Sequence, residues 1–199
     1  MAFDLILASS SQVRSALLTQ ARIPHRALPP RVDEDTAKAA LIAEGATPRD
    51  IADTLAELKA RKLAQNNPTA LVLGCDQTLS LATQLFSKPQ SETDAITQLT
   101  QLQGQTHILH SALVLYDAAQ PVWRHIATAR MTMRPLSPAF ITTYVARYWP
   151  AISHSVGGYL IESEGITLFS AIDGEHTGIL GLPLPPFISY LASRGFITT

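Results

Sequence analysis

Residues 1–14 read MAFDLILASSSQVR, and this stretch decides which fold we expect for the chain. The apolar run at 3–8 predicts a buried strand, which ends at three consecutive serines, 9–11. A helical pattern opens at Gln12, with Arg14 in its first turn. The stretch therefore predicts a strand that leads through a turn of hydroxyl residues directly into a helix.

A strand-to-helix turn of this kind is a candidate anion site. The first backbone N–H groups of a helix lack intrahelical acceptors, and the helix dipole adds partial positive charge, so phosphate binds there. Ser9 and Ser11 add hydroxyl groups, and the guanidinium of Arg14 can hold two phosphate oxygens at once. The alternative is that one serine simply caps the helix and that Arg14 is solvated. The stretch alone leaves both interpretations open.

The composition is that of a chain with a sizeable core and few charges. Of the 199 residues, 46% are hydrophobic and 16% are charged, which suits one large domain or two closely joined lobes. The formal net charge of −1 argues against a nucleic-acid binder. The single cysteine, Cys75, excludes a disulfide framework and a thiolate metal cage. No apolar run approaches the ~20 residues that span a bilayer, and no secretory signal pattern opens the chain, so we expect a soluble, cytoplasmic protein with no membrane partner.

Strand and helix patterns alternate along the chain, with no internal repeat and no low-complexity segment. The stretch 81–90 is expected to be a loop or a short hairpin, and the stretch that begins at Trp149 is expected to be irregular. This order predicts an α/β fold, with a mixed central sheet flanked by helices, in one domain of residues 1–199. Strands are expected at about 3–8, 25–28, 70–73, 106–116 and 122–134, and helices at about 12–21, 49–65, 91–103, 137–148 and 186–194.

Asp76 comes just after the apolar strand at 70–73, where α/β proteins usually place their ligand crevice. A carboxylate there can bind Mg²⁺ or take a proton from water. The alternative is an aspartate that caps the following turn. Neighbouring side chains of a strand point to opposite faces, so Cys75 is expected to face away from the crevice as a buried, inert thiol.

Three further charged residues are candidates for the same site. Glu34 lies in an acidic turn, 33–35, and could join Asp76 at a hard-oxygen Mg²⁺ site, although a solvated acidic turn is the alternative. Lys59 and Lys88 are candidate phosphate ligands, and each by itself could equally be a solvated or snorkelling lysine. The six histidines show no helical metal spacing, and no catalytic triad, P-loop or dinucleotide-binding glycine pattern is present.

Taken together, these elements resemble the Maf family of septum-formation-inhibitor-like nucleoside triphosphate pyrophosphatases. Eight short blocks in register cover nearly the whole chain. The resemblance implies an elongated α/β fold with two lobes around a cleft, a homodimer, and Mg²⁺-dependent cleavage of a nucleoside triphosphate into the monophosphate and pyrophosphate. It also implies a housecleaning role on pyrimidine or modified nucleotides, with links to division arrest. The blocks are LASSS-x-x-R at 7–14, VDE at 32–34, LAELKA at 55–60, LGCDQ at 73–77, KP at 88–89, GQTH at 104–107, GGY at 157–159 and GLPL at 181–184.

The family's functional residues carry over by position. The resemblance makes Asp76 the catalytic proton acceptor and Glu34 a polar residue of the cleft. From their chemistry, we hypothesise that the two carboxylates together hold Mg²⁺ or another divalent cation. One basic residue of the family pattern is missing, because Ser15 stands in its place. The positions that match the family's substrate-binding residues are Ser9, Ser11, Arg14, Lys59 and Lys88.

Three positions match those that select the base in different subgroups of the family. Gln77 and Glu162 resemble the subgroup that acts on 7-methylguanosine triphosphate, whereas Val13 fits neither that subgroup nor the one for thymidine and uridine triphosphates. A carboxylate at 162 suits a guanine edge, whose N1–H and amino group both donate, better than a uracil edge. The preferred base therefore stays open between the two subgroups, as do the oligomeric state and the physiological role.

We hypothesise that Asp76 activates a water for attack near the α-phosphate, while Arg14, Lys59, Lys88 and the N–H groups around the serine turn offset charge on the leaving pyrophosphate. A non-catalytic nucleotide sensor or division regulator is the second hypothesis, and Ser15 is what keeps it open. A pyrophosphatase of the inosine-triphosphate type shares the chemistry but requires a different N-terminal pattern.

Overall fold

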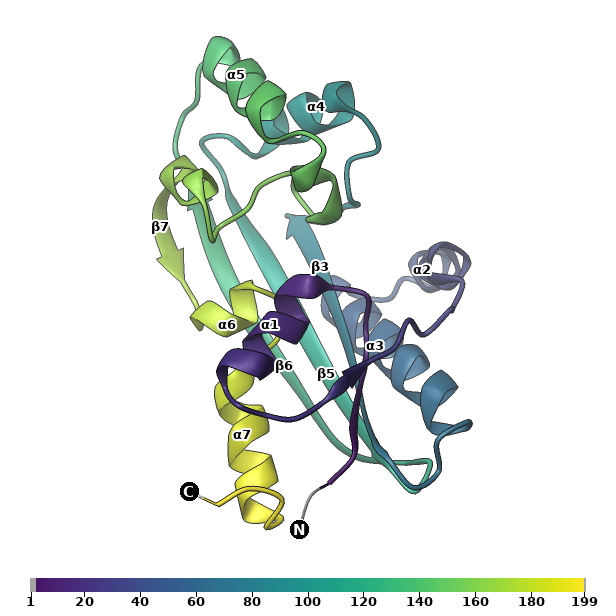
Figure 1. Ribbon diagram of the computed structural model, residues 1–199. Helices are drawn as coiled ribbons and strands as arrows, with labels where there is room; N and C mark the ends of the chain where they lie inside the picture. The colour runs from purple at the N-terminus through teal and green to yellow at the C-terminus, as the bar shows by residue number, and fades with distance from the viewer. Residues whose placement is uncertain (1–2, 199) are drawn as a thin grey trace. The chain divides into compact units, whose positions relative to one another are not determined.

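The computed structural model describes residues 3–198, which form a seven-stranded mixed sheet with helices packed against it (Figure 1). The strands are β1 (Leu5–Ala8), β2 (Arg26–Ala27), β3 (Leu71–Leu81), β4 (Gln84–Phe86), β5 (Thr106–Asp117), β6 (Gln120–Met133) and β7 (Phe169–Asp173). The α-helices are α1 (Gln12–Gln20), α2 (Glu34–Ala43), α3 (Pro48–Ala64), α4 (Glu92–Leu102), α5 (Pro138–Tyr148), α6 (His176–Ile179) and α7 (Leu184–Ser193). Two 3₁₀ helices are η1 (Ala151–His154) and η2 (Glu164–Leu168).

The strand order is β2-β1-β3-β5-β6-β7, with β4 paired to β3 outside this path. β1 pairs in parallel with both β2 and β3, whereas β4 pairs antiparallel with β3 and β7 antiparallel with β6. The predicted α/β class with a mixed central sheet flanked by helices is thus confirmed. The expectation of an elongated molecule with two lobes around a cleft stays a prediction.

The chain divides into two compact units. Within the described residues, unit 1 comprises 3–77, 110–127 and 175–198, and unit 2 comprises 78–109 and 128–174. No helix among residues 3–198 is both long enough and apolar enough to cross a membrane.

In unit 1, side chains that alternate along β1 and β3 supply two separate apolar clusters. Leu7 and Leu73 belong to a cluster with α1 and α7, whereas Ile6 and Val72 belong to a cluster with α3. Both clusters are almost fully buried, as expected for parallel strands covered on both faces. Cys75 lies in the first cluster, so the prediction of a buried thiol is confirmed.

Helix α3 is positioned by its caps and by a stripe of small residues. The Thr47 side chain accepts a hydrogen bond from the N–H of Asp50, and Pro48 occupies the first turn, both typical of a helix start. Its buried face carries alanines four residues apart, which let the helix approach the sheet closely. Gly74 of β3 faces this helix, and a Cβ there would lie 2.0 Å from the carbonyl oxygen of Ala56. Because Gly74 has no side chain, α3 can pack directly against β3 at this position.

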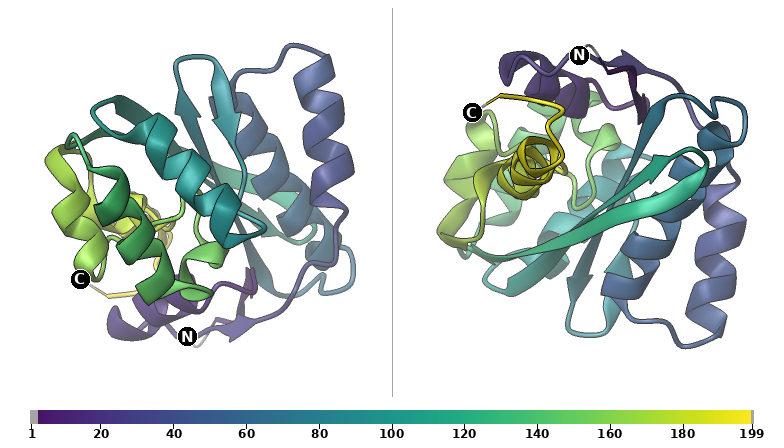
Figure 2. Two further views of the ribbon diagram at one scale, coloured as in Figure 1. Left: turned by 90° about the horizontal axis from the view of Figure 1, so that it is seen from above. Right: turned by 90° about the horizontal axis from the view of Figure 1, so that it is seen from below.

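In unit 2, α4 and α5 lie side by side, as α2 and α3 do in unit 1 (Figure 2). Ser91 and Ser137 accept hydrogen bonds from the N–H groups three residues on, so both predicted helix starts are confirmed. A buried aromatic cluster of this unit joins His107, Tyr159 and Phe169, with ring centroids 5.0–5.9 Å apart.

The structure corrects the predicted elements at three places. β3 continues to Leu81 instead of ending at residue 73, because Gly74 marks the close approach of α3 and the later residues pair with β4. The acidic turn at 33–35 is the start of α2: Asp33 caps that helix, and none of its residues is buried. The irregular stretch after α5 contains η1, η2, β7 and α6.

Candidate functional site

The serine turn after β1 holds Arg14 in a fixed place. Ser11 caps α1, since its Oγ accepts from the N–H of Arg14 at 3.3 Å. The buried Ser9 Oγ accepts from the N–H of Ser11 at 3.2 Å and from Nη1 of Arg14 at 3.4 Å. The capping interpretation of one serine is therefore correct, and the turn additionally positions the guanidinium.

Arg14 also contacts the strand that carries Asp76. Its Nη1 donates to the carbonyl oxygen of Cys75 at 2.9 Å, one peptide before Asp76. Gly181, at φ +89°, lies under the guanidinium, because a Cβ there would be 3.1 Å from Arg14 Nε. Sequence reasoning missed this role of Gly181; the only available signal was its place in the GLPL block.

The carboxylates of Asp76 and Glu34 meet at the ammonium of Lys59. Lys59 Nζ is 2.6 Å from Asp76 Oδ1 and 2.7 Å from Glu34 Oε2. The side chains of Lys59 and Asp76 are only 7% and 10% exposed, whereas that of Glu34 is 46% exposed. Three residues predicted for one site are thus brought together, with the ammonium between the two acids.

Asp76 lies within β3, not after its end. It nevertheless lies at the edge of the parallel part of the sheet, where we expected the ligand crevice. The pairing of β1 with β3 ends at Ala8 opposite Gly74, so Asp76 lies just beyond the carboxyl end of the neighbouring parallel strand. Burial raises the pKa of the Asp76 carboxyl, while Lys59 and Arg14 oppose that shift. A more basic carboxylate is the better proton acceptor at neutral pH.

The two carboxylates suit a divalent cation whose remaining ligands come from phosphate and water. A single nitrogen touches one oxygen of Asp76 and one of Glu34, so the two oxygens already converge on one cation. Hard carboxylate oxygens suit Mg²⁺, which usually takes one or two carboxylates together with phosphate oxygens and water. No group of three or more His, Cys, Asp or Glu in residues 3–198 is arranged to hold a metal by itself.

Gln77 points to the opposite face of β3 from Asp76. Its Nε2 lies 2.7 Å from Ser111 Oγ and 2.9 Å from the carbonyl oxygen of Ile179, and Ser111 Oγ in turn donates to the carbonyl oxygen of Gly178. Because the amide nitrogen donates to these groups, the carbonyl oxygen of Gln77 points away from them. Sequence reasoning missed Ser111, which no motif marks.

The residue that replaces a basic side chain of the family pattern has a partner of its own. Ser15 Oγ is 2.8 Å from His25 Nε2, and His25 Nδ1 is 3.0 Å from the carbonyl oxygen of Ile23. Since a carbonyl oxygen only accepts, Nδ1 carries a proton and donates it; in the neutral imidazole, Nε2 then accepts from the Ser15 hydroxyl. Ser15 is therefore occupied within the chain.

The remaining predicted site residues fall into both units. Val13 lies on α1 and packs against the apolar cluster of α1 and α7. Lys88 is exposed in the segment after β4 of unit 2, and Glu162 is exposed just before η2 of the same unit. Their roles stay predictions.

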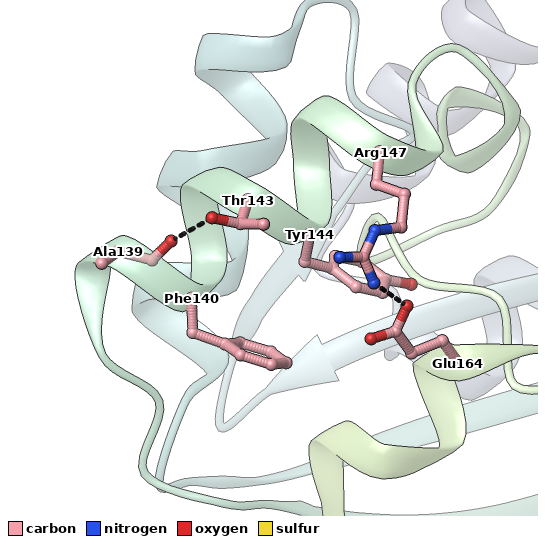
Figure 3. A pocket seen from close by; sticks show the side chains of 6 residues that line it. All are labelled: Ala139, Phe140, Thr143, Tyr144, Arg147 and Glu164. Atoms are coloured by element: carbon pink, nitrogen blue, oxygen red, sulfur yellow. Dashed lines mark hydrogen bonds and ion pairs between the residues drawn. The ribbon is translucent and has the colours of Figure 1, made fainter.

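Unit 2 also has a cavity of about 260 Å³ beside α5 and η2, which includes none of the predicted site residues (Figure 3). The ring of Tyr144 stacks on that of Phe140, and Arg147 pairs with Glu164 at 2.6 Å. The lining residues are Ala139, Phe140, Thr143, Tyr144, Arg147 and Glu164. The two charges neutralise each other, so the cavity offers no net charge to a polyphosphate.

Comparisons with known proteins identify the family of the chain. The family described as "Maf-like protein" matches residues 4–194. A "Nucleoside triphosphate pyrophosphatase" of Ruegeria pomeroyi is 52% identical over 199 residues, with all of both chains covered. A protein of the same name from Roseobacter denitrificans is 51% identical over 191 residues, and a "7-methyl-GTP pyrophosphatase" of Brucella abortus biovar 1 is 45% identical over 191, with 96% of each chain covered in both cases. The chain belongs to the Maf family.

Proposed function

We propose that this protein is a nucleoside triphosphate pyrophosphatase, a hydrolase that releases pyrophosphate and a nucleoside monophosphate. The observation that carries the proposal is the contact of Lys59 with both Asp76 and Glu34. Arg14 lies next to this cluster, because it donates a hydrogen bond to the carbonyl oxygen of the residue before Asp76. Acidic and cationic groups that adjoin in this way suit a polyphosphate and its cation. The relatives named for this activity support the same assignment.

In the proposed reaction, Asp76 accepts a proton from a water molecule. The water oxygen forms a bond to the α-phosphorus while the bond from that phosphorus to the bridging oxygen of the β-phosphate breaks, and pyrophosphate leaves with the electron pair. A divalent cation held by Asp76 and Glu34 would neutralise charge on the phosphate oxygens. The raised pKa of Asp76 makes it a stronger base than a free aspartate.

Arg14 and the N-terminus of α1 bind phosphate in this proposal. The guanidinium uses Nη1 for Ser9 and Cys75, and its other nitrogens have no acceptor among residues 3–198. The N–H groups of Gln12 and Val13 likewise find no acceptor in the described chain, which is usual for a first helical turn. Lys88 is proposed as a further phosphate ligand, because the resemblance assigns it that place.

We propose a methylated guanine nucleotide of the 7-methyl-GTP type as the preferred substrate, with thymidine and uridine triphosphates as the alternative. The name of the Brucella relative supports the first. The Glu162 carboxylate would accept from the N1–H and amino group of guanine. Gln77 has its amide nitrogen committed to Ser111 and residues 178–179, so its carbonyl oxygen is the part of this side chain that remains as an acceptor.

The test is pyrophosphate release by Asp76→Asn with 7-methyl-GTP, GTP, UTP and dTTP as substrates and Mg²⁺ present. Losing the proton acceptor is expected to cost about 3–4 kcal/mol of transition-state stabilisation, which is two to three decades in rate. Asp117→Asn, at the far end of β5, is the matched control. Near-normal turnover by folded Asp76→Asn would overturn the assignment.

A non-catalytic nucleotide sensor is the second candidate, favoured by the engagement of Ser15 with His25 where the family pattern has a basic residue. Tight nucleotide binding without monophosphate formation in the same panel would select it. We also propose, from the family resemblance, a cytoplasmic homodimer; light scattering of the purified protein tests the dimer.

A further inference from the structure

The Lys59 ammonium occupies the position at which the proposed function needs a metal ion. Its two contacts, 2.6 Å to Asp76 Oδ1 and 2.7 Å to Glu34 Oε2, are as short as strong charge-assisted hydrogen bonds. These are also the oxygens that converge on a single cation. One buried positive charge thus already satisfies both acids.

The fold holds Lys59 in this position. The residue lies on the buried face of α3, between Ala56 and Ala60, which abut Gly74 of β3. Its side chain is 7% exposed, so water screens its contact with Asp76 very little. Glu34, by contrast, begins α2 and is 46% exposed, so the cluster opens to solvent on the Glu34 side.

We infer that Lys59 and a divalent cation compete for Asp76 Oδ1 and Glu34 Oε2. In the free protein, Lys59 holds the two carboxylates together; when the cation binds with its phosphate ligand, the ammonium leaves these oxygens. The reason is electrostatic: a dication and an ammonium that share the same two oxygens would lie within a few ångströms of each other and repel strongly. The nucleotide-free protein should therefore bind divalent cations weakly.

This inference rests on the proposed function for the cation, but it makes Lys59 more than a phosphate ligand. A lysine that only contacted phosphate would leave metal binding unchanged when nucleotide is absent. A lysine that blocks the metal position must oppose metal binding in that condition. The two roles therefore predict different outcomes for the same variant: unchanged metal binding for the first and tighter metal binding for the second.

The test is Mn²⁺ binding to the nucleotide-free protein, measured by the electron paramagnetic resonance signal of free Mn²⁺. Lys59→Met removes the ammonium and keeps an unbranched side chain, and we expect Mn²⁺ to bind at least tenfold more tightly. Lys62→Met, which removes an exposed charge from the same helix, is the matched control and should change the affinity less than twofold. Adding Glu34→Gln to Lys59→Met should abolish the gain.

Unchanged or weaker Mn²⁺ binding by folded Lys59→Met would overturn the inference, as would a gain that survives Glu34→Gln. A measurement on the unmutated chain covers the case in which the variant fails to fold. The Nζ resonance of Lys59 should shift when saturating Mg²⁺ and a non-hydrolysable triphosphate are added, and an unmoved resonance would contradict displacement. None of these readouts depends on pyrophosphate release, so failure of the proposed function is recognised separately.

Discussion

Each unit contains a cluster of polar side chains that are largely removed from water. The two clusters compensate for the lost hydration in different ways. In unit 1, Nζ of the buried Lys59 contacts Oδ1 of the buried Asp76 and Oε2 of the half-exposed Glu34 at 2.6–2.7 Å. In unit 2, His107 is completely buried, with Nε2 2.8 Å from the hydroxyl of Tyr159. Its Nδ1 has no partner among the described residues, and burial lowers the pKa of His107 to about 4.

The difference separates the cluster that we propose as the ligand site from one that supports the fold. The acid–lysine cluster lies next to solvent on the side of Glu34, and in our proposal it exchanges the ammonium for a divalent cation. A neutral imidazole among Tyr159 and Phe169 makes ring contacts that stabilise the core and has no charge to offer. Lys59 lies in the family block 55–60 and His107 in the family block 104–107. Membership of a block therefore does not distinguish a proposed ligand-binding residue from one that supports the fold.

The largest expected effect is on the charged cluster. Lys59→Met in EDTA leaves Asp76 buried without its ammonium, and removing one partner of a buried pair should lower the free energy of unfolding by about 3 kcal/mol. Lys62→Met should stay within about 0.5 kcal/mol of the parent. Urea unfolding of the three proteins measures this, and equal stability would show that the buried pair contributes no more than an exposed one.

The neutral cluster should instead respond to pH. His107 has a pKa of about 4 when folded, against about 6.5 for a histidine in an unfolded chain. The unfolded state therefore binds the extra proton first, so stability is full above pH 6.5 and falls as pH decreases toward 4, by up to about 3 kcal/mol. The difference in unfolding free energy between the parent and His107→Phe, measured from pH 7 to pH 4, should shrink accordingly. A constant difference across that range would contradict a neutral, buried His107.

A smaller effect should follow from removing the partner of His107. Tyr159→Phe leaves His107 Nε2 buried without a hydrogen bond, which should cost about 1–2 kcal/mol. Tyr190→Phe is the matched control, because the Tyr190 ring stacks on Trp123 and its hydroxyl has no partner in residues 3–198. Thermal unfolding compares the stability of the two variants. An equal loss of stability in both would show that the hydrogen bond between His107 and Tyr159 does not contribute.

The smallest stability effect should occur beside Arg14. Gly181→Ala puts a Cβ at φ +89° and against the guanidinium, so stability should fall by about 1 kcal/mol and tripolyphosphate should bind several-fold more weakly. Gly195→Ala carries similar backbone strain at φ +71° but has open space around it. Calorimetric titration should show weaker binding for Gly181→Ala alone, and a shared loss would mean that strain, not displacement of Arg14, is responsible.

Capping residues and apolar periodicity predicted the helices whose starts depend on residues close in sequence. The starts of α1, α4 and α5 follow from serine caps, and α3 follows from Pro48 and its periodic apolar face. α2 was not predicted because its capping Asp33 and the acidic residues after it look the same in sequence as a solvated turn. The length of β3 was not predicted because Gly74 resembles a strand end. In the fold, that glycine serves a contact with α3, which lies outside any local window.

The sequence by itself determined the α/β alternation, the family and the set of candidate residues, since periodicity, capping and short motifs are local in the chain. Only the tertiary structure decided how those residues pair. Lys59 joins Asp76 and Glu34 instead of standing free, Gln77 turns its amide nitrogen toward residues 178–179, and Ser15 is occupied by His25. The physical reason is that a hydrogen bond or ion pair depends on distances of about 3 Å between groups far apart in sequence, and packing alone fixes those distances.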